Sequence, residues 1–324
     1  MSSKDIVLGF LEQNKDRYIS GQDMADTLGY SRNAVWKAIT DLRSKGYEID
    51  AVKNRGYRLS PKSDILSVQG ISSFLDFEPQ IHIYDSLAST NRTALEMAID
   101  GAGHGTVVIA GEQTMGRGRF GRDFISPPGG LYMSLILRPD EISFEQPELV
   151  TAFIGGAVCD AVSLFTAPAP GIKWVNDIYI EDKKVCGILT ESGAEYETGQ
   201  ISYIVAGIGI NIDTDMALFP EEYREHIGRL SDFTDEKISR NNLCAEIIKR
   251  ILPGTLPSKK EVIDLYRSKL LYIGKEIRVT KGRDKSECFE ARATDIDDEC
   301  HLIVRGSDGM MQKLSYREHS IVIK

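Results

Sequence analysis

The chain has 324 residues, of which 42% are hydrophobic and 27% are charged. These fractions exclude a largely disordered protein, and the length predicts two or three domains because domains cluster at roughly 100–150 residues. The net charge of −9 argues against nucleic-acid binding only if the charge is spread evenly along the chain. The longest apolar stretch, residues 149–165, contains two glycines and an aspartate and is shorter than the ~20 residues that span a bilayer. We therefore expect no membrane segment.

The N-terminus and the cysteines indicate the compartment. The first residues lack the charged, apolar and small-residue regions of a signal peptide. The five cysteines are far apart and include no C-x-x-C pair, so we expect neither structural disulfides nor a cysteine zinc site. These features predict a cytoplasmic protein.

The first 46 residues predict three short helices. Apolar residues recur at helical spacing over residues 4–18 and again after Gly21. Gly29 then provides a helix stop, and Ser31 an N-cap for a third helix that runs to about Gly46. Two helices joined by a tight glycine-containing turn are typical of a helix-turn-helix.

A basic hairpin follows the third helix. Residues 47–52 and 56–59 alternate like two strands around an Asn-Arg-Gly turn, which suits a hairpin. Residues 31–60 carry seven Lys and Arg against three acidic residues, a net charge of +4, whereas the other 294 residues carry −13. The pattern predicts a DNA-binding winged helix-turn-helix, and the modest charge predicts a dimer on a two-part operator. The alternative is a module that only packs. The residues expected to contact DNA are Ser31, Arg32, Asn33, Lys37 and Arg55.

Beyond a linker predicted at residues 60–63, strands and helices alternate to about residue 271, and hairpin-like strand pairs favour an α+β sheet over a parallel one. The expected strands are 80–84, 106–111, 131–137, 171–175, 178–180, 185–191 and 201–210, and the expected helices are 90–100, 149–165, 240–251 and 259–270. Short strands at 276–280, 288–295, 301–305, 311–316 and 321–323 then predict a small β-barrel. The predicted domains are residues 1–62, 63–271 and 272–324.

Nine of the 29 glycines lie between residues 101 and 130, around the run Gly-Arg-Gly-Arg-Phe-Gly-Arg at residues 116–122. Three guanidinium groups beside exposed glycine amides suit a polyphosphate or an acyl phosphate. The run also has the G-x-G-x-x-G spacing of dinucleotide-binding loops, but Pro127 and Pro128 follow where such a loop must open a helix. The alternative is a solvated basic loop.

Three further clusters are ambiguous when taken alone. Residues 173–177, Lys-Trp-Val-Asn-Asp, place Asn176 and Asp177 in a turn between apolar strands, and a Lys-Lys pair follows at 183–184. An ordinary turn and an exposed lysine pair would explain both. Residues 89–91, Ser-Thr-Asn, precede a helix and are explained by N-capping alone. Glycines in the run 207–211 allow a ligand or backbone to approach the sheet closely.

In this order, these motifs resemble the catalytic domain of biotin protein ligases, and the glycine-arginine run is the most specific of them. With the helix-turn-helix in front and the barrel behind, the whole chain resembles the bifunctional bacterial form, a biotin ligase and biotin-operon repressor. The resemblance implies a multidomain α+β protein with a winged helix-turn-helix, a class II synthetase-like ligase domain with a mixed sheet, and an SH3-like barrel. One departure is Val175, where the family usually has proline; it could loosen the turn but removes no functional group.

The resemblance implies a two-step reaction. Biotin and ATP form biotinyl-5′-AMP with the help of Mg²⁺, and a lysine of the biotin carboxyl carrier protein domain then attacks this mixed anhydride. The implied partners are the carrier domain, operator DNA and, when biotinyl-5′-AMP is bound, a second copy of the chain, with no membrane. The implied repressor acts on genes for biotin biosynthesis or transport.

The resemblance also implies three groups of site residues, with no resident metal ligand. The catalytic group is Lys184, Arg117, Arg119 and Asp177, in which Lys184 bridges the biotin carboxylate and the α-phosphate, and Asp177 acts on the attacking amine or on a metal. The biotin group is Ser89, Thr90, Asn91, Gln113, Arg117, Gly118, Arg119 and Lys184. The ATP and adenylate group is Gly116, Arg119, Arg122, Lys173, Asn176 and Asn211.

Three alternatives remain at this stage. A lipoate-type ligase shares the fold class and the acyl-adenylate strategy, although the arginine loop and the DNA-binding domain favour biotin. A biotin-sensing repressor without ligase activity would not need Lys184, Arg117 and Arg119. A ligase whose first domain no longer binds DNA would not need the basic wing.

Overall fold

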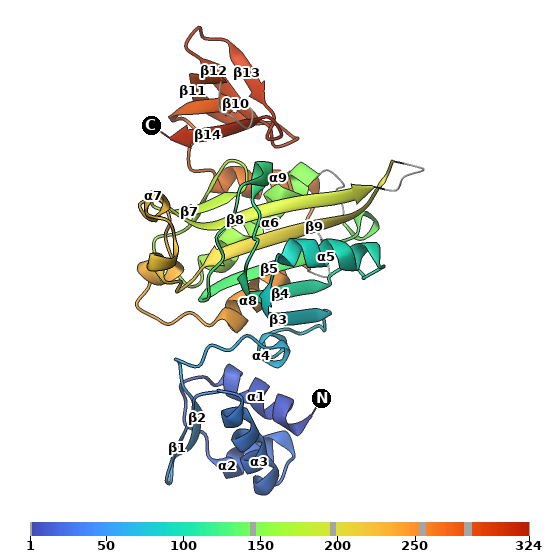
Figure 1. Ribbon diagram of the computed structural model, residues 1–324, viewed down its shortest axis with the longest axis vertical. Coiled ribbons are helices and arrows are strands. Elements are labelled where there is room, and N and C mark those ends of the chain that lie inside the picture. Colours follow the sequence, from blue (N-terminus) through green and yellow to red (C-terminus); the bar gives the residue numbers. More distant parts are fainter. Residues whose placement is uncertain (1, 143–146, 195–198, 253–256, 282–286, 324) are drawn as a thin grey trace. The chain divides into compact units, whose positions relative to one another are not determined.

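The computed structural model describes residues 2–142, 147–194, 199–252, 257–281 and 287–323 (Figure 1). The chain forms two compact units. The first comprises Met1–Pro79 and Asp235–Lys249, and the second comprises Gln80–Thr234 and Arg250–Lys324. The boundary predicted after residue 62 lies inside the first unit.

The first unit begins with the predicted three helices and hairpin. Ser31 Oγ accepts a hydrogen bond from the Ala34 backbone N–H at 3.2 Å, and Gly29 ends the second helix with φ +70°, as expected for these caps. The first helix ends five residues earlier than predicted, because the Asn14 N–H and side chain both bond to the Phe10 carbonyl. The elements are α1 Ser3–Gln13, α2 Gly21–Leu28, α3 Arg32–Ser44, β1 Ile49–Val52, β2 Gly56–Leu59 and α4 Val68–Ser72.

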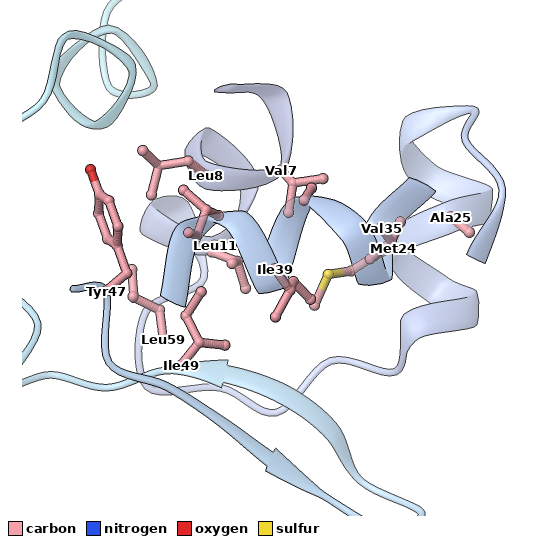
Figure 2. Close-up of a cluster of buried hydrophobic side chains, with 12 residues drawn as sticks. Val7, Leu8, Leu11, Met24, Ala25, Val35, Ile39, Tyr47, Ile49 and Leu59 are labelled. Carbon is pink, nitrogen blue, oxygen red and sulfur yellow. The ribbon is translucent and has the colours of Figure 1, made fainter. Parts of the chain in front are cut away.

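The three helices share one core with the hairpin. The inward residues of α3, Val35 and Ile39, are at most 1% exposed and belong to a cluster with Leu11 of α1 and Met24 of α2 (Figure 2). This apolar face leaves the other face of α3 to solvent.

The wing turn is fixed by backbone geometry. Asn54 and Gly56 adopt φ +65° and +97°, and β1 and β2 pair antiparallel with Val52 opposite Gly56. A Cβ at Gly56 would lie 2.0 Å from the Ile19 carbonyl oxygen, so only glycine fits here.

The first unit also contains most of helix α8, Arg240–Ile251. Asn241 is fully buried and donates to Glu12 Oε1 at 3.1 Å and to the Ile65 carbonyl at 2.9 Å. Arg240 Nε lies 2.6 Å from Asp64 Oδ2. The predicted linker is packed too: its two serines, at 60 and 63, are buried. A segment distant in sequence therefore completes the first unit.

The second unit is built on a seven-stranded sheet of order β3-β4-β5-β9-β8-β7-β6. The β3–β4 pair is parallel and the other pairs are antiparallel, so the predicted mixed sheet is confirmed. The strands are β3 Ile81–Leu87, β4 Val107–Gln113, β5 Gly130–Leu137, β6 Gly171–Lys173, β7 Asp177–Ile180, β8 Lys183–Ala194 and β9 Ile201–Asn211. The helices are α5 Thr90–Ile99, α6 Pro147–Val162, α7 Glu221–Arg224 and α9 Lys259–Lys269.

Helices α5 and α6 cover opposite faces of this sheet (Figure 1). Asn91 of α5 bonds to Glu191 of β8, whereas Thr151 of α6 bonds to Thr190, the residue before Glu191 in that strand. Successive strand residues point to opposite faces. Strand β5, between β4 and β9, is buried along its whole length because both faces of the sheet are covered there.

The chain ends in a five-stranded antiparallel sheet of order β13-β12-β11-β10-β14. The five predicted strands are present as β10 Glu276–Lys281, β11 Glu287–Ile296, β12 Leu302–Gly306, β13 Met311–Leu314 and β14 His319–Ile323. Trp174 Nε1, just after β6 of the seven-stranded sheet, donates to the Cys300 carbonyl at 2.9 Å, which joins the two sheets of the second unit.

All five cysteines are free thiols. Within the part of the chain that the structure describes, no helix combines the length and the apolar character needed to cross a bilayer.

Candidate active site

One pocket on the α5 face of the sheet brings together all of the predicted ligand and catalytic residues except Gly116 and Asn211. It lies where α5, the glycine-arginine loop, the turn before β7 and strands β8 and β9 meet. The predicted residues that line it are Ser89, Thr90, Asn91, Gln113, Arg117, Gly118, Arg119, Arg122, Lys173, Asn176, Asp177 and Lys184.

The start of α5 is held by a buried polar network. Ser89 caps the helix by accepting from the Arg92 N–H. Gln113 Oε1 accepts from the Thr90 N–H at 2.8 Å and from its hydroxyl at 3.1 Å, while Gln113 Nε2 donates to Ser126 Oγ at 2.8 Å. Helix capping accounts for Ser89 but not for the other two residues. The remaining hydrogen bonds hold the Gln113 amide and the Thr90 hydroxyl at the pocket wall.

Asn91 is fixed from three sides. Its Nδ2 donates to Glu191 Oε2 at 2.8 Å, and its Oδ1 accepts from Ser134 Oγ at 2.7 Å. A Cβ at Gly207 would lie 2.0 Å from Asn91 Oδ1, so the glycine makes room for the amide. Sequence reasoning missed Ser134 and Glu191, although a serine inside the apolar run 131–137 was a signal for the first.

The glycine-arginine loop folds back on itself. The Gly118 N–H donates to the Arg122 carbonyl at 2.7 Å, and the Phe124 N–H to the Gly116 carbonyl at 2.9 Å. A Cβ at Gly116 would lie 2.3 Å from the Phe124 carbonyl oxygen, so Gly116 is needed for this close approach. The loop leads through a short 3-10 turn to a strand, not to the α-helix that a dinucleotide-binding loop opens.

Arg119 is the most enclosed arginine of the loop. Its Nη1 lies 3.2 Å from Asn176 Oδ1, and its Nη2 donates to the backbone carbonyls of Tyr316 and His319, just before and at the start of β14. Burial lowers the pKa of the Arg119 guanidinium, and the charge of Asp177 opposes that shift. These hydrogen-bond partners are neutral oxygens. Arg119 therefore offers an anion a partly desolvated positive charge.

Lys184 and Asp177 form an ion pair inside the pocket. Lys184 Nζ lies 2.7 Å from Asp177 Oδ1, with the two side chains 29% and 24% exposed. The Lys184 backbone is pinned on both sides, since its N–H donates to the His226 carbonyl and its carbonyl accepts from the Gly228 N–H. The ammonium group is thus fixed at the pocket but remains open to a second anion.

The turn before β7 is tightly anchored. The strand predicted over residues 171–175 ends at Lys173, and the Trp174–Val175 peptide bond is cis. The Val175 carbonyl accepts from the Tyr266 hydroxyl at 2.7 Å, and Asn176 exchanges hydrogen bonds with the Ile188 backbone. These bonds hold the turn, although valine at this position lacks the fixed φ of proline.

Phe124 is a pocket residue that sequence reasoning missed. Its ring lies against Gly209 and Gly187, where a Cβ would come within 2.3 Å and 2.9 Å of ring carbons. Lys184 Nζ is 5.9 Å from the ring centroid. The glycines of β8 and β9 therefore admit an aromatic ring onto the sheet, beside the lysine; the sequence signal was the glycine pattern itself.

Asn211, at the end of β9, lies outside the pocket lining. It is 5% exposed, and its Nδ2 donates to the Gly228 carbonyl at 3.3 Å. Its assignment to the nucleotide remains a prediction.

The predicted DNA-contacting residues are all exposed: Ser31, Arg32, Asn33, Lys37 and Arg55. Arg55 stacks on the Tyr18 ring, with its guanidinium carbon 4.3 Å from the ring centroid. Arg58, another basic residue of the segment 31–60, forms ion pairs with Asp50 and Asp16. The exposed cations Arg32 and Lys37 thus lie on α3, and Arg55 lies at the wing tip.

Comparison with known proteins gives three family matches. The chain matches the Biotin/lipoate A/B protein ligase family over residues 84–211, an HTH domain over residues 6–58 and the Biotin protein ligase C terminal domain over residues 272–316. It is 38% identical over 315 residues to the "Bifunctional ligase/repressor BirA" of Bacillus subtilis, covering 95% of each chain.

Two solved structures of biotin protein ligases are also similar to this chain. A biotin protein ligase from Aquifex aeolicus in complex with biotin and ATP aligns with a TM-score of 0.64 and 27% identity, over 76% of this chain and 99% of the other. A biotin protein ligase from Leishmania major in complex with biotinyl-5-AMP aligns with a TM-score of 0.52 and 27% identity, over 73% and 99%.

Proposed function

The chain belongs to the family of bifunctional ligase/repressor BirA proteins, as its motifs predicted, and we propose that it joins biotin to a carrier-protein lysine and represses biotin genes. The observation that carries the ligase half is the single pocket that combines Arg119, Lys184 and the polar start of α5. Similarity over 95% of a bifunctional relative favours biotin over lipoate and favours retention of both activities.

In the first step a biotin carboxylate oxygen attacks the α-phosphorus of ATP. The new P–O bond forms as the bond to the bridging oxygen breaks, and pyrophosphate leaves with that electron pair. A carboxylate and a triphosphate repel each other, so the step needs fixed cations at the reacting oxygens. Lys184 would bridge the carboxylate and the α-phosphate, and Arg119 would meet the phosphate from the loop, with Arg117 beside it and Arg122 further out.

The pocket also suits a magnesium ion carried on the phosphates. Mg²⁺ is usually held by one or two carboxylates in addition to phosphate oxygens, and Asp177 and Asp123 line the pocket. The bound ion would neutralise charge on the phosphates. Lys173 and Asn176, on the turn before β7, would bind the nucleotide part.

Biotin would lie against the start of α5. Its ureido ring needs a few convergent donors and acceptors, which Ser89, Thr90, Asn91 and Gln113 supply, together with the backbone of Gly118. The ring of Phe124 offers an apolar wall. The network that already fixes Asn91 and Gln113 lowers the entropy cost of recognition.

In the second step the neutral carrier lysine attacks the carbonyl carbon of the mixed anhydride. The C–N bond forms, the C–O bond to AMP breaks, and the amine loses a proton. Asp177 would orient the amine or accept that proton, because its carboxylate lies in the pocket beside Lys184. Asp177→Asn should slow single-turnover transfer from preformed biotinyl-5′-AMP, and normal transfer would exclude this role.

The loop should retain the adenylate between the two steps. Arg119 ties the loop to Asn176 and to the carbonyls near β14, which closes it over the pocket. Arg119→Gly should release biotinyl-5′-AMP and label bystander lysines. Tight retention in this variant would contradict the assignment.

The repressor half would depend on the ligand state. We propose that biotinyl-5′-AMP favours a homodimer whose two winged domains bind a two-part operator, by binding more tightly to the dimer than to the monomer. Consumption of the adenylate by apo carrier would then free the operator. Sedimentation should show a larger species with biotin and Mg·ATP; an unchanged mass at every reachable concentration would refute the coupling. A protein that consumes ATP in this way would work in the cytoplasm.

The ligase proposal is tested by transfer of labelled biotin to an apo carrier domain with and without Mg·ATP. ATP-dependent labelling by the wild type, lost in Lys184→Ala, is the expected result. No labelling, combined with biotin-dependent operator binding, would favour the sensor without catalysis.

A further inference from the structure

Helix α3 carries an exposed aromatic residue that neither its core nor its cations explain. Trp36 is 61% exposed, although tryptophan is usually largely buried. Val35 and Ala38, on either side of the Trp36–Lys37 pair, are at most 3% exposed. The helix therefore places the indole on the side opposite its packed face.

Trp36 lies in the middle of the polar face of α3. Asn33, Trp36, Lys37 and Thr40 follow each other at the i, i+3, i+4, i+7 spacing that aligns residues along one side of a helix, and all four are exposed. The Thr40 hydroxyl donates to the Trp36 carbonyl at 2.9 Å, so it is used within the helix. The indole thus stands between an amide and an ammonium group on the surface expected to enter the major groove.

The chemistry of that groove suggests what the indole meets. Asn33 can read a base edge and Lys37 a phosphate or a guanine, but neither contacts an apolar group favourably. The thymine C5-methyl is the apolar feature of the major groove. An indole desolvated against a methyl group gains free energy only where thymine is present, so it adds sequence information that phosphate contacts lack.

We propose that Trp36 is a specificity-determining residue that contacts a thymine methyl group in the operator. The inference rests on the proposed repressor function and deepens it, because it assigns the chemical feature that α3 reads. It requires the operator half-site to contain a thymine at a fixed position opposite the middle of α3.

The test uses the full chain with biotin and Mg·ATP. The duplex of highest affinity is first selected from a random pool with the wild type, and binding to it is compared with binding to a random-sequence duplex. Trp36→Ala should weaken binding to the selected duplex about tenfold, the loss typical of one mismatched base pair. Binding to the random duplex and the salt dependence should not change, since no charge is lost.

Deoxyuridine then isolates the methyl group. Replacing each thymine of the selected duplex singly by deoxyuridine should reveal one position per half-site where the wild type binds about fourfold more weakly, the value of one buried methyl group. At that position the change from thymine to deoxyuridine should not alter the affinity of the Trp36→Ala variant. Trp36→Phe should keep part of the discrimination between thymine and deoxyuridine. Leu164 is another exposed apolar residue, and Leu164→Ala should keep all of that discrimination.

Three results would overturn the inference. In the first, Trp36→Ala has the wild-type melting temperature and the same ratio of affinities for the selected and the random-sequence duplex as the wild type. In the second, replacing thymine by deoxyuridine weakens binding by the wild type and by Trp36→Ala equally. If the wild type selected no sequence from the pool, the repressor function would fail as well, whereas sequence selection without a Trp36 effect leaves that function standing.

Discussion

Replacing Lys184 by alanine separates catalysis from stability. The Lys184–Asp177 pair joins side chains that are 29% and 24% exposed, and its atoms lie 2.7 Å apart. A partly exposed pair of this kind contributes about 0–1 kcal/mol to the free energy of unfolding. We therefore expect the melting temperature of Lys184→Ala to fall by no more than about 4 °C.

The catalytic loss should be much larger. Lys184 is a half-buried cation at the pocket, and the loss of one preorganised charge-stabilising group typically slows a reaction by about 10²–10³-fold. Arg119 remains, so the variant should retain activity above background. The assay is pyrophosphate release in the first step and transfer of labelled biotin to apo carrier in the second, both at saturating Mg·ATP.

Lys183→Ala is the matched control. Lys183 is the preceding residue, but its ammonium donates to the Glu225 carbonyl and does not line the pocket. We expect this variant to react within about threefold of the wild type, since it loses one surface contact. Equal losses in the two variants, or full activity in Lys184→Ala, would refute the role of a fixed cation at the reacting oxygens.

Other predictions concern packing, titration and DNA. Gly209→Ala should displace Phe124 and raise the KM for biotin or ATP about tenfold or more, whereas Gly103→Ala, with open space around it, should not; equal effects would contradict the packing account. Burial raises the pKa of Glu12, so the folded state holds its proton to higher pH, and stability is lost as pH rises from about 4.3 through the folded pKa. Urea unfolding at a series of pH values should show that the free energy of unfolding of Glu12→Gln falls less than that of the wild type as pH rises. The same pH dependence in both proteins would contradict this role of Glu12. Arg55→Ala should weaken all DNA binding alike and lower the salt slope by about one, which filter binding in a salt series would check.

Local signals in the sequence were enough for the elements and for the glycine-arginine loop. Gly29 and Ser31 ended and began helices as expected, because caps depend on a few neighbouring backbone groups. Charge and glycine spacing indicated that the loop suits a phosphate group. The other site residues, Lys184 among them, were assigned from the resemblance to biotin protein ligases, and Lys184 lines the same pocket as the loop.

Partners distant in the chain could not be predicted. Glu191 holds Asn91 across 100 residues, and Asn241 meets Glu12 across 229. Such pairs depend on strand register and helix docking, which single-sequence patterns do not specify. Phe124 was missed for the same reason, since its position follows from two glycines on separate strands.

The position of α8 has a consequence for dissecting the protein. Because Asp235–Lys249 belongs to the first unit, the backbone passes between the units three times, after Pro79, after Thr234 and after Lys249. Removing residues 1–62 as a presumed independent domain would strip Glu12 from Asn241 and leave a buried amide of α8 facing water. A ligase truncated in this way would lose part of the support for its own helix, so repressor and enzyme are covalently interleaved and not simply joined end to end.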